Sequence, residues 1–133
     1  MDERTSRLLG GVIAVIVAVF PAFFCVFNAV FSDVFSLGER LLTFALVFAA
    51  YAVLGFIFGY VWPGVSYWWG LWLGIPALLI LIWYSTREPG QILLHIAYIV
   101  VTIASGCLGG YAGAWLRTRM GQRNVSQTTD DGR

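Results

Sequence analysis

Charged residues are scarce in this chain of 133 residues: they make up 11% of it, against about 25% in soluble domains. Lysine is absent, so all eight basic residues are arginine. No charged residue occurs in three long blocks, residues 8–32, 41–86 and 89–116. A soluble fold of this size has no interior large enough to bury such blocks, so the sequence excludes a soluble globular domain.

Residue types that carry chemistry are equally scarce, with two cysteines and one histidine. In the predicted helices Cys25 and Cys107 differ in depth by about 13 Å, whereas a disulfide needs Cα atoms within about 7 Å. Two distant cysteines and one histidine make no metal site. Ser105 lies about 15 Å along one helix from His95, too far for a nucleophile and its base. We therefore expect no enzyme activity, no metal and no cofactor.

Long apolar runs dominate what remains, and 59% of the chain is hydrophobic. A hydrocarbon core of about 30 Å needs about 20 apolar residues per helix. The first block provides one span, and the second is long enough for two, with Pro63-Gly64 at the expected turn. We predict an all-α integral membrane protein in which residues 1–116 form one domain of four transmembrane helices, at about 8–31, 41–62, 68–84 and 92–116.

Short connections favour antiparallel neighbours, so we predict an up-down four-helix bundle. Both termini and the turn at 63–67 then lie on one side, with six arginines against two on the other. Because basic residues concentrate in the cytoplasm, this predicts cytoplasmic termini (N-in/C-in). Arginine without lysine is typical of a GC-rich genome, so we expect a prokaryotic cytoplasmic (inner) membrane. Residues 117–133 contain almost no bulky apolar side chain, which predicts a disordered cytoplasmic tail.

Glycines recur at four-residue spacing in the last three predicted helices. Residues four apart share a helix face, so such strips allow two helix backbones to approach closely. The strips are explained either by packing within the chain or by a dimer interface. The glycines predicted to pack are Gly55, Gly59, Gly70, Gly74, Gly106, Gly109, Gly110 and Gly113.

Ionisable residues inside a membrane span are candidates for function, and His95 is the one such residue here. Asn28 is predicted to lie at a similar depth, near the outer end of the first helix, so the two form a candidate polar pair. One interpretation is a histidine that snorkels to the headgroups or bonds to backbone. The other is a ligand-binding or proton-responsive His95 that Asn28 orients.

The length and the four helices resemble those of the small multidrug resistance transporters. That family depends on a glutamate in its first helix, and here no acid occurs between Arg7 and Asp33. We therefore expect a non-enzymatic membrane protein that acts through helix–helix association, as a homo-oligomer or as an accessory subunit, in contact with membrane lipid and not with nucleic acid. The alternative is an oligomeric transporter or channel for an apolar or weakly polar solute, with its pathway between protomers.

Overall fold

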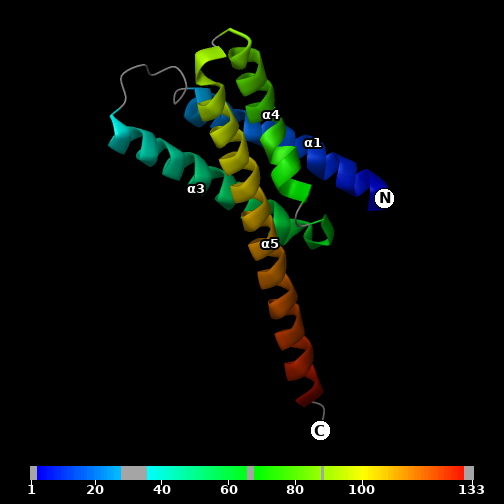
Figure 1. The fold of residues 1–133 in the computed structure, drawn as a ribbon. Helices are drawn as coiled ribbons and strands as arrows, with labels where there is room; N and C mark the ends of the chain where they lie inside the picture. The colour runs from blue at the N-terminus through cyan, green and yellow to red at the C-terminus, as the bar shows by residue number, and fades with distance from the viewer. Residues whose placement is uncertain (1–2, 28–35, 66–67, 88, 131–133) are drawn as a thin grey trace.

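The computed structural model describes residues 3–27, 36–65, 68–87 and 89–130, and this part of the chain is helical with short connections. Its elements are α1 (Glu3–Pro21), the π-helix η1 (Ala22–Phe27), α3 (Leu37–Val61), the 3₁₀ turn η2 (Pro63–Val65), α4 (Trp68–Ser85), the 3₁₀ turn η3 (Pro89–Gln91) and α5 (Ile92–Asp130) (Figure 1). Four segments are long and apolar enough to cross a membrane: Arg4–Phe24, Leu37–Val61, Trp68–Ser85 and Pro89–Gln122. The predicted all-α class with four such helices is confirmed.

The start of α3 is fixed by a capping box. The Ser36 backbone N–H donates to Glu39 Oε2 at 2.8 Å, and the Glu39 N–H donates to Ser36 Oγ at 3.4 Å. This reciprocal pair satisfies two backbone donors that a helix start leaves without partners. The helix therefore begins at Leu37, before the predicted start at 41, because the prediction placed the polar residues in a loop.

The sequence predicted one helix from about residue 8 to residue 31, but the first span is a regular α-helix only as far as Pro21. Pro21 has no backbone N–H and cannot donate to a carbonyl of the preceding turn. At Ala22 the helix changes to the wider π form, which ends at Phe27. Residues 28–31 of the predicted span lie outside the described residues.

The last helix extends to Asp130, well beyond its predicted end at 116. The predicted disordered segment, 117–133, is thus helical as far as Asp130 in this structure. No proline interrupts 92–130, and arginine, methionine and glutamine between 117 and 123 favour helix, whereas the residues from 124 onward are mostly poorer helix formers. Extending an existing helix also avoids the cost of nucleation, which a prediction from composition alone did not consider.

The helix α5 occupies the centre of the arrangement. Its interface with α3 is the most extensive in the molecule, and its interface with α4 is the next. In Figure 1, α4 and α5 run side by side in opposite directions, while α3 crosses α5 obliquely. The helix α1 packs mainly on α4, and α3 makes little contact with α4 although the two are consecutive.

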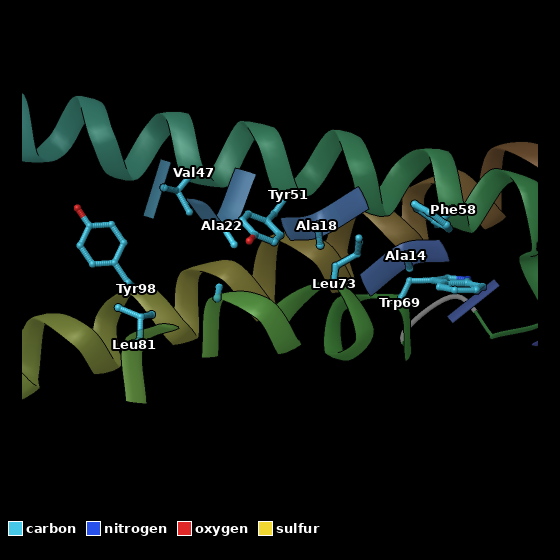
Figure 2. Close-up of a cluster of buried hydrophobic side chains, with 11 residues drawn as sticks. Ala14, Ala18, Ala22, Val47, Tyr51, Phe58, Trp69, Leu73, Leu81 and Tyr98 are labelled. Carbon is cyan, nitrogen blue, oxygen red and sulfur yellow. The ribbon is translucent and has the colours of Figure 1, made fainter. Parts of the chain in front are cut away.

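The buried core runs between these helices (Figure 2). The first span contributes a strip of small residues at four-residue spacing, Ala14 and Ala18 of α1 and Ala22 of η1, all with no exposed surface. Such a strip allows α1 to lie close to its neighbours. The other helices contribute Ala77 and seven larger side chains: Val47, Tyr51, Phe58, Trp69, Leu73, Leu81 and Tyr98.

Candidate functional site

The glycines of α3 face those of α5. A methyl group added to Gly55 would lie 3.1 Å from the Cα of Gly106, and one added to Gly59 would lie 2.7 Å from the Cα of Gly110. Residue numbers rise together along this contact, so the two helices run in the same direction there. Neither position has room for a side chain, because the atoms opposite belong to backbone.

A second row of α5 glycines lies beside the first and meets the same part of α3. A methyl group on Gly109 would lie 2.9 Å from the backbone nitrogen of Phe56, and one on Gly113 would lie 2.8 Å from that of Tyr60. Both rows of α5 glycines are therefore occupied by the backbone of α3.

The glycines of α4 pack on another side of α5. A methyl group on Gly70 would lie 2.8 Å from the carbonyl oxygen of Ile103, and one on Gly74 would lie 3.1 Å from the Ile103 side chain. Gly106 is enclosed from two directions, because a methyl group there would lie 2.8 Å from the Cα of Gly70. All eight of these glycines thus lie against another helix of the same chain.

Polar side chains form a buried row along α5, which we call the polar column. Its members are His95, Tyr98, Thr102 and Ser105, each at most 2% exposed. Their spacing of three, four and three residues places them on one helix face. Of these four residues the sequence predicted a function only for His95, although the spacing was a signal that the other three share its helix face.

The neighbours of the polar column are mostly aromatic. The ring of Tyr84 meets that of His95 edge-on at 5.5 Å, and Phe44 stacks on Tyr98 at 4.2 Å. The Ser105 hydroxyl donates to the Thr102 carbonyl of its own helix at 3.0 Å. The Thr102 hydroxyl has no hydrogen-bond partner within the part of the chain that the structure describes.

The predicted pair of Asn28 and His95 stays a prediction, because Asn28 lies outside the described residues. The imidazole of His95 is buried among other side chains, which argues against its snorkelling outward. Among the described residues, no three His, Cys, Asp or Glu side chains gather where they could hold a metal. The side chains of the polar column carry hydroxyl and imidazole groups, which can donate and accept hydrogen bonds.

Arg117 joins α5 to the end of α3. Its Nη1 donates to the carbonyl oxygens of Tyr60 and Val61, at 2.8 and 2.5 Å. The last carbonyls of a helix lack partners within it and carry partial negative charge, so a cation is favourable there. Arg117 thus has a packing role in addition to the topological one that the sequence indicated.

An apolar groove lies between residues 16–21 of α1 and residues 46–54 of α3. We call it the α1–α3 groove; its volume is about 610 Å³. The small side chains of Ala49 and Ala50 on α3 face larger ones on α1, including Ile16 and Phe20. The other lining residues are Val17, Pro21, Leu46, Val53 and Leu54.

Residues 6–63 are similar to a family of unknown function, DUF6954, and this segment includes α1 and α3 but not α4 or α5. Neither the curated proteins nor the solved structures contain a match to the chain.

Proposed function

We propose that this protein is a small, non-enzymatic integral membrane protein that acts through helix–helix association. Its four long apolar helices support insertion into a membrane. The distribution of arginines supports an up-down course with both termini in the cytoplasm, and arginine without lysine supports a prokaryotic inner membrane. The partner is a second copy of the chain or another membrane protein to which it is an accessory subunit.

The observation that carries this proposal is the α1–α3 groove. The glycine strips already pack against other helices of the same chain. The groove lies between α1 and α3, which contact each other little, and the small residues Ala49 and Ala50 line its α3 side. Small residues allow a partner helix to approach closely, and van der Waals packing is a main source of stability between membrane helices. We therefore assign the association to this groove.

The test fills the groove without touching the glycine contacts. Ala49→Leu and Ala50→Leu should each weaken association, because the added side chains occupy the space for the partner. Ala104→Leu is the matched control, since Ala104 is exposed on α5 and lines none of the cavities described here. Energy transfer between labelled chains in liposomes measures self-association, and stoichiometric co-purification measures an accessory role. Equal association by all three variants would refute the assignment.

A second candidate function is an oligomeric transporter or channel for an apolar or weakly polar solute, with its pathway between protomers. The polar column is the observation that favours a transport function, because buried polar side chains in a membrane commonly mark substrate or ion pathways; this column faces the interior of one protomer, so it would act beside the pathway and not at the contact between chains. His95→Ala and Thr102→Val should then reduce solute flux into proteoliposomes, while Ala104→Leu leaves it unchanged. Flux that is identical in these variants, or absent for every solute tested, would exclude this function.

A further inference from the structure

A small pocket lies where the starts of α1 and α4 meet. Arg7 and Leu8 of α1 and Trp69 and Trp72 of α4 line it, and its volume is about 80 Å³. A water molecule occupies about 30 Å³ in the liquid, so the pocket has room for a group the size of a phosphate. The exposed guanidinium of Arg7 provides planar N–H donors, which suit phosphate oxygens.

A glycine pair one turn after the arginine shapes this pocket. Gly10 and Gly11 share a helix face with Arg7 because they follow it by three and four residues. A methyl group on Gly10 would lie 2.9 Å from the ring of Trp69, and one on Gly11 would lie 3.1 Å from that of Trp72. The backbone of α1 therefore rests on the two indoles, which places Arg7 at their edge.

An apolar groove begins at the same tryptophan. Trp72 also lines a cavity of about 330 Å³, whose other lining residues are Trp68, Leu71, Gly74, Ile75, Leu78 and Ile103. Leu78 follows Trp68 by ten residues, which is about 15 Å along α4. This is half of the roughly 30 Å hydrocarbon core, so the groove matches the depth of one leaflet.

We infer that the pocket and this groove form one binding site for an anionic phospholipid. Its phosphate lies at Arg7 and one acyl chain lies along α4. Charge complementarity at Arg7, together with an apolar groove one leaflet deep, identifies this occupant. Tryptophans are also enriched at the depth of lipid headgroups. Free phosphate shares the headgroup chemistry but leaves the groove empty. The inference rests on the proposed insertion into a membrane.

The test titrates the full chain in non-ionic detergent with phosphatidylglycerol, phosphatidylcholine or inorganic phosphate. Native mass spectrometry counts the bound molecules. We expect the chain to bind one phosphatidylglycerol more tightly than phosphatidylcholine or phosphate. Arg7→Gln should lower the affinity for phosphatidylglycerol about five-fold. Arg4→Gln is the matched control, because Arg4 is also exposed and does not line the pocket. Ile75→Trp fills the groove and should weaken phosphatidylglycerol binding, although Arg7 is unchanged.

Three outcomes would overturn the site: equal binding by the Arg7 variant and the wild type, equal losses in the Arg4 and Arg7 variants, or phosphate binding as tightly as phosphatidylglycerol. Thermal unfolding of each variant without lipid shows whether the fold is retained. Alkaline carbonate extraction of membranes separates failure of the site from failure of the proposed function. A chain that resists extraction but binds no phosphatidylglycerol refutes only the site, whereas an extracted chain refutes membrane insertion.

Discussion

Adding one methyl group at Gly59 tests the contact between α3 and α5. In Gly59→Ala the new Cβ would lie 2.7 Å from the Cα of Gly110, a backbone atom that moves only if the two helices separate. Overpacking of this kind costs about 1–3 kcal/mol. Alanine recovers up to about 1 kcal/mol through its better helix propensity. Because the atoms opposite are backbone, the cost lies at the upper end of that range, and we predict a net loss of about 2 kcal/mol in the free energy of unfolding.

The matched control is Gly38→Ala, in the first turn of the same helix, where an added methyl group meets nothing within 4 Å. This variant should be as stable as the wild type or slightly more stable, because only the propensity gain applies. Reversible unfolding in mixed micelles with increasing SDS, followed by tryptophan fluorescence, measures both variants. A Gly59→Ala protein as stable as Gly38→Ala would show that α3 and α5 do not pack as closely as described.

Three further predictions concern individual side chains. Thr102→Val should leave the free energy of unfolding unchanged or raise it by about 1 kcal/mol, because it removes a buried hydroxyl without a partner among the described residues. SDS unfolding measures this free energy, and a clear loss of stability would contradict the prediction. Arg117→Gln should increase amide hydrogen exchange in the last turn of α3 about ten-fold, whereas Arg119→Gln should not, since only Arg117 bonds to the carbonyls there. Trp69→Phe should cost about 1 kcal/mol in the same unfolding assay, because it removes the indole N–H that donates to the Trp62 carbonyl at 3.2 Å; unchanged stability would count against that bond.

The sequence was sufficient for the number and approximate positions of the helices. Uncharged blocks show directly where a chain can cross a membrane, and Pro63-Gly64 marked the turn that the structure places at Pro63–Val65. Helix ends were less predictable because local chemistry sets them. The capping box of Ser36 and Glu39 moved one start outward, and helix propagation carried α5 past Leu116.

The candidate sites were only partly visible in the sequence. Regular spacing identified the glycines, but nothing in that spacing shows that Gly106 meets both Gly55 and Gly70. The strip of Ala14 and its neighbours was missed because alanine is unremarkable in an apolar helix. Thr102 was interpreted as a member of the small-residue strip of Gly106 and Gly110, and not as a buried polar residue. Which face of a helix is buried depends on tertiary packing.

The number of subunits in lipid tests the proposed association most directly. Native mass spectrometry of the wild-type chain released from nanodiscs gives this number, and proteins that co-purify in fixed ratio appear in the same spectrum. We predict a discrete dimer or higher oligomer, or a stoichiometric complex with another membrane protein, and in either case its loss in Ala50→Leu. A monomer with no stoichiometric partner would contradict the proposed function.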